Sequence, residues 1–153
     1  MRRRRKRVFT FVELLVSMTV VGILSAVAVP KYIDLKRRAN TTKVIGDIQV
    51  VRVAVMTFFA DSAYFPAEVG AGVTPKNLQK YLPIGFSFSE PRWTLDYENW
   101  SVDAESSVTD APSLIGVSVT TQDPELGEAT SRLLGNVPQF TAGNSVTFLI
   151  SGM

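Results

Sequence analysis

The residue types that usually perform catalysis or bind metals are scarce in this chain of 153 residues, which contains neither histidine nor cysteine. Without imidazole or thiolate there is no general base that titrates near neutral pH, no thiol nucleophile, no disulfide and no ordinary zinc or iron–sulfur site. Serine and aspartate are present, but an ordinary catalytic triad also needs histidine. The sequence therefore predicts a protein that is not an enzyme and that holds no cofactor and no metal.

Basic residues are concentrated at the N-terminus. Six of the 16 lie within residues 2–7, and the chain beyond residue 8 has 10 basic and 14 acidic residues, a net charge of −4. A short basic leader on a mildly acidic body argues against nucleic-acid binding by the whole protein. The arginine run also lies next to an apolar segment and lacks interleaved aromatic residues, so we expect no nucleic acid bound through the leader.

Residues 8–29 form an apolar segment of 22 residues with one charge, Glu13. As a helix this segment would extend about 33 Å, enough to cross the hydrocarbon layer of a bilayer. A cleaved secretory signal is one interpretation, because Ala26 and Ala28 have the spacing of a leader-peptidase site, but such signals have apolar regions of only about 7–15 residues. A plain signal anchor explains the length and the basic flank. A buried helix of a water-soluble protein fits poorly with so long an apolar run.

Glu13 is the acid within this segment, and an acidic side chain inside a bilayer costs roughly 2.5–3.5 kcal/mol on insertion scales. No cation lies within the segment to offset that cost. Either Glu13 lies close enough to the interface to reach water or headgroups, or its partner comes from another molecule. The second interpretation gives this residue a function.

The residues around Glu13 resemble those of a known family. The run FTFVELLV at residues 9–16, followed by Gly22 and Pro30, is similar in order and spacing to the class III signal and N-terminal helix of type IV pilins and type II secretion pseudopilins. One residue departs from the family pattern, because Val8 stands where the family has glycine before the scissile bond. A β-branched residue restricts the backbone there. Either the peptidase accepts Val8, or cleavage is slow or absent.

The resemblance implies a specific role for each of these residues. A prepilin peptidase would cleave between Val8 and Phe9 and methylate the new amino group of Phe9. The Glu13 carboxylate would then pair with the Phe9 amine of a neighbouring subunit, which is favourable inside hydrocarbon because both charges are otherwise poorly solvated. The helix between Gly22 and Pro30 would lose helicity or kink on packing, in keeping with the low helix propensity of both residues.

The same resemblance implies where the protein is stored and what it meets. It would be a single-pass protein of the inner (cytoplasmic) membrane with its head outside the cytoplasm, and later part of a periplasmic or extracellular filament. The six leader cations outweigh the four beyond the segment, which favours a cytoplasmic N-terminus. The implied partners are other copies of this chain or other pilins, the prepilin peptidase, and the assembly platform with its ATPase.

Residues 31–60 predict a continuation of the helix, because they contain one glycine and no proline. Apolar residues recur there at spacings of 4, 3, 4 and 3, which places them on one helical face: Val44, Ile48, Val51, Val55 and Phe58. We expect a helix from about residue 9 to about residue 61, with its second half packed against a sheet. Pro30 is expected either to kink it or to end its first part.

The remaining residues predict a β-rich head. A short helix is expected within residues 74–83, with Thr74 as its N-cap and Pro83 as its stop, and another over residues 125–134. Alternation of Ile115, Val117 and Val119 with small or polar residues predicts a half-exposed strand. The expected strands are residues 85–89, 92–97, 100–104, 114–121 and 145–150, with a turn at 98–99. The predicted fold is α+β and pilin-like: a long N-terminal helix packed on a small antiparallel sheet.

Candidate sites in the head are few. Asp123, Glu125 and Glu128 could supply oxygen ligands to calcium, which some major pseudopilins bind, but solvated surface acids are the favoured interpretation. Three aromatic residues could form a recognition patch, but core positions are favoured because strand aromatics are more often buried: Trp93, Tyr97 and Trp100.

The resulting prediction divides the chain into four parts: a leader (1–8), a transmembrane and polymerisation helix (9–30), its amphipathic continuation (31–61) and a globular head (62–153). The expected function is that of a structural subunit of a type IV pilus-like or type II secretion pseudopilus filament. The alternative is a single-pass membrane-anchored binding protein that does not polymerise. Which kind of filament it builds, including a DNA-uptake fibre, and whether it is a major or a minor subunit, do not follow from these residues.

Overall fold

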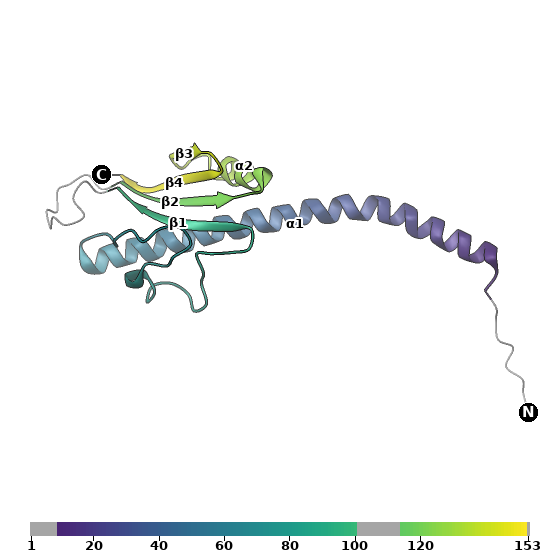
Figure 1. Ribbon diagram of the computed structural model, residues 1–153, viewed down its shortest axis with the longest axis horizontal. Coiled ribbons are helices and arrows are strands. Elements are labelled where there is room, and N and C mark those ends of the chain that lie inside the picture. Colours follow the sequence, from purple (N-terminus) through teal and green to yellow (C-terminus); the bar gives the residue numbers. More distant parts are fainter. Residues whose placement is uncertain (1–8, 101–113, 153) are drawn as a thin grey trace, which may run out of the picture. The chain divides into compact units, whose positions relative to one another are not determined.

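The computed structural model describes residues 9–100 and 114–152. Its elements follow one another along the chain (Figure 1): helix α1 (Phe11–Ser62), the short 3-10 turn η1 (Lys76–Leu78), strand β1 (Trp93–Asn99), strand β2 (Leu114–Thr121), helix α2 (Pro124–Leu133), strand β3 (Gln139–Ala142) and strand β4 (Ser145–Gly152). The chain divides into two units, one ending at Ala39 and the other beginning at Asn40. The predicted α+β fold, with one long N-terminal helix and a small antiparallel sheet, is confirmed.

Helix α1 is 52 residues long and continues through Pro30 without a break. It ends one turn after its last buried residue, where Ala63 adopts a positive φ of 61° and donates its N–H to the Phe59 carbonyl. This is the left-handed residue that commonly follows a helix. The predicted bounds of the long helix therefore hold to within about two residues, and the prediction that Pro30 might end its first part is wrong.

All four strands of the head pair antiparallel in the order β1-β2-β4-β3. Strands β1 and β2 pair in register from Trp93 opposite Thr121 to Asn99 opposite Ile115. Strand β2 pairs with β4, and a β-bulge between Ile115 and Gly116 shifts that register. On the outer edge of β1, the Leu95 carbonyl accepts a backbone hydrogen bond from Gly72 and the Trp93 carbonyl accepts one from Glu90. The Leu95 N–H donates to the Phe88 carbonyl.

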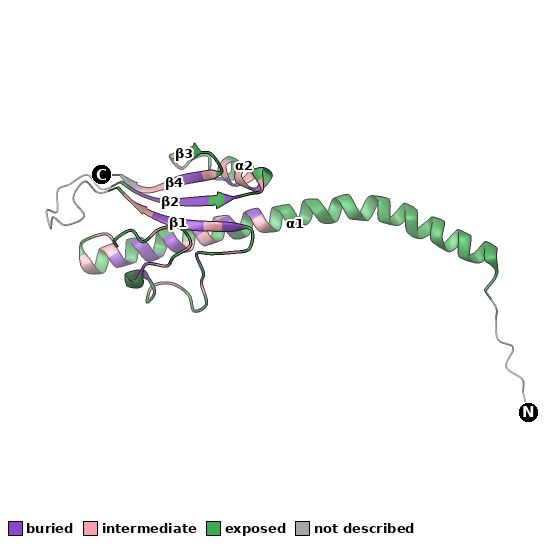
Figure 2. Cartoon of the chain, viewed as in Figure 1, coloured by how far each residue is buried: buried purple, intermediate pink, exposed green. Residues whose placement is uncertain are grey.

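The second half of α1 supplies one wall of the core. All five residues of the predicted stripe are buried, none more than 5% exposed. Figure 2 shows buried residues in the part of α1 that lies beside the sheet. The sheet supplies Leu95, Tyr97, Val117 and Phe148, and Leu126 of α2 joins the same cluster. The expected packing of the second half of the long helix on the sheet is confirmed.

Two predicted elements near β1 are wrong. Residues 85–89 form no strand; Ser89 makes only an isolated bridge to Thr94, and the Ser87 hydroxyl bonds to the Ser89 carbonyl. Glu98 and Asn99 are not a turn but the last residues of β1. Glu98 accepts a hydrogen bond from the Ser118 hydroxyl, and the Asn99 amide donates to the Pro66 carbonyl. Tertiary partners thus keep two typical turn residues extended.

A further strand was predicted over residues 100–104. All of it except the first residue lies outside the described residues.

Other local predictions are corrected in detail. The helix expected within residues 74–83 is only η1, with Pro75 rather than Thr74 at the cap position and no side-chain cap; a run this short between two prolines cannot sustain a regular helix. Strand β2 is not half-exposed, because Ser118 is buried between Glu98 and Thr147. Gly116 is also buried, and a Cβ there would lie 3.0 Å from the Trp100 ring.

Strand β3 was not predicted, whereas the second predicted helix, α2, is confirmed over Pro124–Leu133. Gly143 and Asn144 connect β3 to β4, and Gly143 has a φ of +59°. A two-residue connection of Gly and Asn is a recognised hairpin signal. The strand escaped prediction because it has only four residues, most of them exposed.

Candidate assembly site

Thr10 and Glu13 define the start of α1. The Thr10 hydroxyl oxygen accepts a hydrogen bond from the Glu13 backbone N–H (3.2 Å), and the Thr10 carbonyl accepts one from the Leu14 N–H (3.2 Å). Thr10 is therefore the N-cap of α1. This cap was not predicted, although Thr-x-x-Glu before an apolar run is the capping-box pattern. Val8, the residue before the predicted cleavage point, lies outside the described residues.

The Glu13 side chain lies in the first turn of α1 and is exposed. A negative charge at this end of a helix is stabilised by the helix dipole. Its neighbours are apolar and exposed, including Phe9 (67%) and Phe11 (77%). Within residues 9–100 and 114–152, no cation lies within ion-pair distance of this carboxylate and no side chain donates a hydrogen bond to it. Any partner of the Glu13 carboxylate therefore lies outside the described part of this chain.

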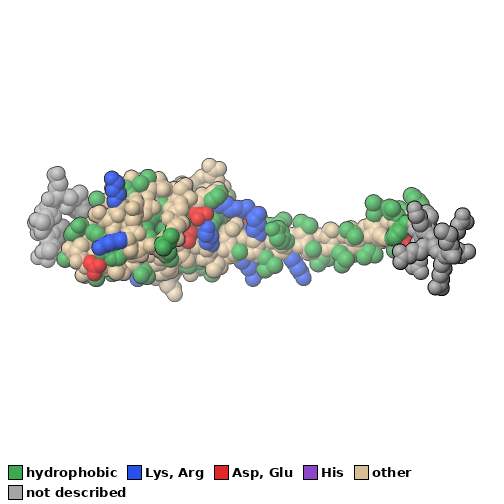
Figure 3. All heavy atoms as spheres, turned by 90° about the horizontal axis from the view of Figure 1, so that it is seen from below, with side chains coloured by type: hydrophobic (Ala, Val, Ile, Leu, Met, Phe, Trp, Pro, Cys, Tyr) green, Lys and Arg blue, Asp and Glu red, His purple; other side chains and the backbone are tan. Residues whose placement is uncertain are grey.

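The first half of α1 is apolar on every side. All of residues 11–29 are exposed, and Figure 3 shows hydrophobic side chains along this part of the helix. The hydroxyls of Ser17 and Thr19 donate to the carbonyls of Glu13 (2.7 Å) and Leu15 (2.8 Å). Both hydroxyls thus have hydrogen-bond partners within the helix. A side chain in the hydrocarbon layer needs such a partner because no water is available there. By length and composition α1 is the one helix in the described part of the chain that can cross a membrane.

Gly22 and Pro30 both lie inside α1, and the helix is continuous at each. A Cβ added at Gly22 would meet no atom within 4 Å, so packing within a single chain does not require glycine there. The predicted loss of helicity between these residues concerns the assembled filament and stays a prediction.

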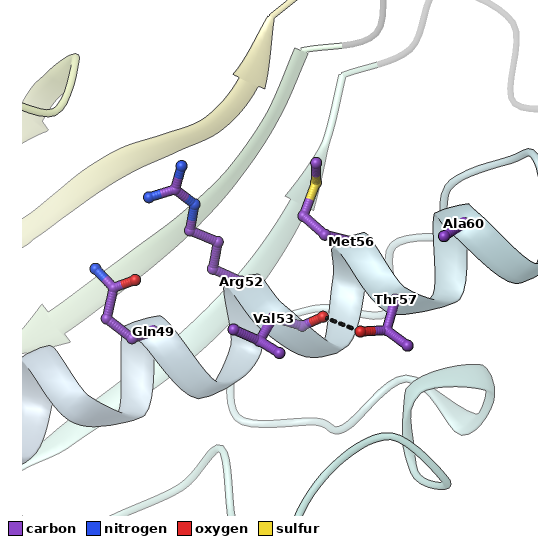
Figure 4. Close-up of a pocket in the computed structure, with 6 residues that line it drawn as sticks. All are labelled: Gln49, Arg52, Val53, Met56, Thr57 and Ala60. Atoms are coloured by element: carbon purple, nitrogen blue, oxygen red, sulfur yellow. Dashed lines mark hydrogen bonds between the residues drawn. The ribbon is translucent and has the colours of Figure 1, made fainter.

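A second exposed face of α1 lies within the head unit. Six residues of this helix border an open depression of about 500 Å³ (Figure 4): Gln49, Arg52, Val53, Met56, Thr57 and Ala60. Val53 is 64% exposed and Met56 is 42% exposed. The Thr57 hydroxyl donates to the Val53 carbonyl. Beside the apolar side chains of this face, the depression presents the amide of Gln49 and the guanidinium of Arg52. It contains no group of residues with catalytic chemistry.

An ion pair connects α1 to the segment before β1. The Lys43 ammonium lies 2.9 Å from the Glu90 carboxylate and 5.1 Å from the centre of the Trp93 ring. Asp47 lies one turn further along α1, and burial raises the pKa of its carboxyl while the charge of Lys43 opposes that shift. These contacts position the helix on the sheet.

Asp96 is a carboxyl of the head whose pKa is strongly raised. It lies on β1 opposite Ser118, and its Oδ1 atom is buried without a hydrogen-bond partner. Burial, together with the negative charges of Glu98 and Glu68, raises the pKa of the Asp96 carboxyl from 3.8 to about 6. Since the folded state binds this proton more tightly than the unfolded state, ionised Asp96 destabilises the fold above about pH 6, and protonation removes that penalty as the pH falls.

We therefore expect Asp96→Asn to raise the stability of the head at pH 8, with the gain shrinking as the pH falls from 6 towards 4. Urea midpoints measured across this pH range test the prediction. Glu128→Gln is the matched control, because the Glu128 side chain is 72% exposed and should give no such pH-dependent difference. A gain for Asp96→Asn that is constant with pH, or largest at pH 4, would contradict the assignment.

The acidic residues considered as calcium ligands have other partners. Asp123 is the N-cap of α2, its carboxylate accepting a hydrogen bond from the Leu126 N–H (3.4 Å). Glu128 forms an ion pair with Arg132 at 2.6 Å. In the part of the chain that the structure describes, no three acidic side chains come together as metal ligands.

The three aromatic residues considered as a recognition patch separate into two groups. Trp93 and Tyr97 are buried (4% and 0% exposed), as predicted for core positions, but Trp100 is 37% exposed. The Trp100 ring lies 5.8 Å from that of Phe140 on β3, which is itself 46% exposed. The core prediction is therefore right for two of these residues and wrong for Trp100, because Trp100 follows the last residue of β1 and packs over Gly116.

One comparison with known proteins matches the N-terminus of the chain. A family model described as the prokaryotic N-terminal methylation motif matches residues 3–29. The matched range includes Val8, Phe9, Glu13 and Gly22, and Pro30 follows it directly. All of the candidate assembly residues except Pro30 thus lie within the matched motif.

Three curated relatives extend the similarity beyond the motif. The type IV narrow pilus major component PilA5 of Thermus thermophilus is 34% identical over 104 residues, 67% of this chain and 82% of that protein. A fimbrial protein of Pseudomonas aeruginosa is 33% identical over 82 residues, 53% of this chain and 49% of its own length. The type II secretion system core protein G of Klebsiella michiganensis is 33% identical over 66 residues, 43% and 46% of the two chains.

The chain spans about half the length of the fimbrial proteins it matches. No solved structure matches it.

Proposed function

This chain belongs to the type IV pilin family, and on that premise we propose that it is a structural subunit of a pilus-like or pseudopilus filament. It is stored in the inner membrane through residues 9–30 and polymerises through that helix. Residues 1–8 are its leader, residues 31–61 continue the helix and residues 62–153 form the head. The observation that carries the proposal is Glu13: an acid in the first turn of an apolar, membrane-length helix, without a partner in the described part of the chain.

In the proposed assembly step, a prepilin peptidase cleaves between Val8 and Phe9 and methylates the Phe9 amine. That amine becomes the cation that Glu13 of a neighbouring subunit lacks. Pairing two charges in hydrocarbon offsets the insertion penalty of each and defines one register between neighbouring helices. Val8 is bulkier than the glycine usual at this place, so the peptidase of this organism must accept a β-branched residue.

The head is proposed to have a structural role. The buried stripe of α1 packs on the sheet, and the Lys43–Glu90 ion pair connects the helix to the segment before β1, so that movement of the helix carries the head with it. The exposed face of α1 around Val53 and Met56 offers further apolar surface to a neighbouring helix. Energy for polymerisation would come from a separate ATPase acting through a platform protein, and the proposed role requires no catalysis by this chain.

Fractionation of the native cells distinguishes a filament subunit from a membrane-anchored binder, for which the exposed Trp100–Phe140 pair would be the recognition surface. A subunit is expected either in filaments sheared from the cells or in the periplasmic fraction. It should disappear from that fraction when the prepilin peptidase is deleted. An anchored binder would stay in the membrane fraction whether or not the peptidase is present. The second result would overturn the proposal.

A further inference from the structure

The residues that follow the apolar segment form a cationic collar, defined here as Lys31, Lys36, Arg37 and Arg38. All four side chains are exposed, and Asp34 is the single acid among them. The collar begins directly after Pro30, where the run of residues 8–29 ends. Its net charge of +3 contrasts with the net charge of −4 of the chain beyond residue 8. This local reversal of charge needs a physical explanation.

The collar surrounds the helix rather than following one face. At 3.6 residues per turn each residue advances by about 100°. Arg38 therefore lies about 20° from Lys31, whereas Lys36 and Arg37 lie about 140° and 240° around the helix from Lys31. An acidic protein surface that docks on one side of a helix would meet only part of such an arrangement. A layer of anionic groups that encloses the helix would meet all of it.

A lipid headgroup layer has that geometry. Phosphates lie on every side of a helix that leaves the bilayer, and lysine and arginine reach them with long, flexible stems. Tyr32 and Leu35, both 66% exposed, lie between the cations. A tyrosine at this level is typical of a membrane interface, where its ring is apolar and its hydroxyl meets water. Arginine also binds phosphate oxygens in a two-point fork.

We propose that the collar binds the phosphates of anionic phospholipids in the leaflet opposite the leader while the subunit is stored in the membrane. The inference rests on the proposed membrane storage. In this topology the collar lies on the non-cytoplasmic side of the membrane, where the positive-inside rule predicts few cations. The leader has six cations against four in the collar, and this excess keeps the N-terminus cytoplasmic. Anionic lipid would hold the subunit at a defined depth and would be released when the helix enters a filament.

Site-specific photo-crosslinking from Leu35 tests the proposal. The full chain, with Leu35→p-benzoylphenylalanine, is reconstituted in vesicles of equal amounts of phosphatidylglycerol and phosphatidylethanolamine. In the proposed topology the leader belongs to the other face of the bilayer, about 30 Å of hydrocarbon away, so that crosslinks from Leu35 report on the collar. We expect crosslinks to phosphatidylglycerol to exceed those to phosphatidylethanolamine by about fivefold at low salt, and the excess to shrink in high salt because the charges are screened.

Two variants with the same loss of charge make the comparison specific. The collar variant replaces all four cations by glutamine: Lys31, Lys36, Arg37 and Arg38. The control variant does the same to four cations of the head: Lys76, Lys80, Arg92 and Arg132. The excess of phosphatidylglycerol should disappear in the collar variant and persist in the control.

The outcomes separate this inference from the proposed function. The parent protein is the full chain with only the Leu35 substitution. If it resists alkaline extraction from the vesicles but crosslinks equally to both lipids, the collar assignment alone is overturned. The collar assignment is also overturned if the collar and control variants show the same lipid preference, or if position 35 crosslinks mainly to a protein in the native membrane. Release of the parent protein by alkali would overturn membrane storage and, with it, this inference.

Discussion

Glu13→Gln is expected to lower the amount of this chain recovered in sheared filaments by at least about tenfold, while the variant still inserts into the membrane. The missing interaction is the proposed pair between the Glu13 carboxylate and the Phe9 amine of the next subunit. Hydrogen bonds to charged groups contribute about 1.5–3 kcal/mol, and each 1.4 kcal/mol corresponds to a factor of ten. Insertion itself should improve, because a neutral side chain enters hydrocarbon at lower cost.

Glutamine is more informative here than alanine, because Glu13 also occupies the third helical position after the Thr10 cap. Glu and Gln are both found at that position of a capping box, so Glu13→Gln keeps the start of α1 and removes only the charge. Glu128→Gln on α2 is the charge-matched control and should leave recovery unchanged. Normal recovery of Glu13→Gln would mean that Glu13 serves the helix start alone, and the proposed pairing would be wrong.

Phe148→Ala is expected to destabilise the head by about 3–5 kcal/mol, the range for removing a large buried aromatic side chain. Phe148 lies on β4, is 1% exposed and belongs to the core cluster that includes the buried face of α1. Since a domain of this size is stable by about 5–15 kcal/mol in total, the loss is a large part of the whole. Urea unfolding followed by tryptophan fluorescence measures it, because both tryptophans, Trp93 and Trp100, are in the head.

Phe140→Ala provides the matched control, because Phe140 is the same residue type on the adjacent strand but is 46% exposed. It loses mainly its aromatic contact with Trp100, and such pairs contribute about 0.5–1.5 kcal/mol. Similar losses of stability for the two variants would contradict the placement of Phe148 in the core and of Phe140 at the surface.

The helical part of the fold was predictable because its signals are local. Val44, Ile48, Val51, Val55 and Phe58 repeat with the helical period, and all of them are buried. Strand β1 was less predictable, since the extended conformation of Glu98 depends on Ser118, 20 residues away. The Trp100 ring likewise lies against Gly116 through a contact between two separate strand ends. Contacts of this kind are set by the tertiary fold and leave no periodic pattern in the sequence.

The candidate assembly site was predictable in part. Glu13 stood out because a single acid in an apolar segment is costly, an argument from residue type alone. Thr10 was missed because its role is visible only from its spacing to Glu13, which the capping-box pattern describes. The raised pKa of Asp96 could not be predicted at all, since it arises from burial and from the charges of Glu68 and Glu98, which the fold brings close to this carboxyl.

The N-terminal residue of the chain in sheared native filaments, determined by intact and peptide mass spectrometry, tests the central claim most directly. A filament subunit assembled as proposed begins at N-methylated Phe9, with the bond after Val8 cleaved. A chain that begins at Val29 would be a head released by a leader peptidase, and the filament subunit assignment would be wrong. An intact leader beginning at Met1 or Arg2 would place six cations where the Phe9 amine should meet Glu13, and would contradict the proposed pairing.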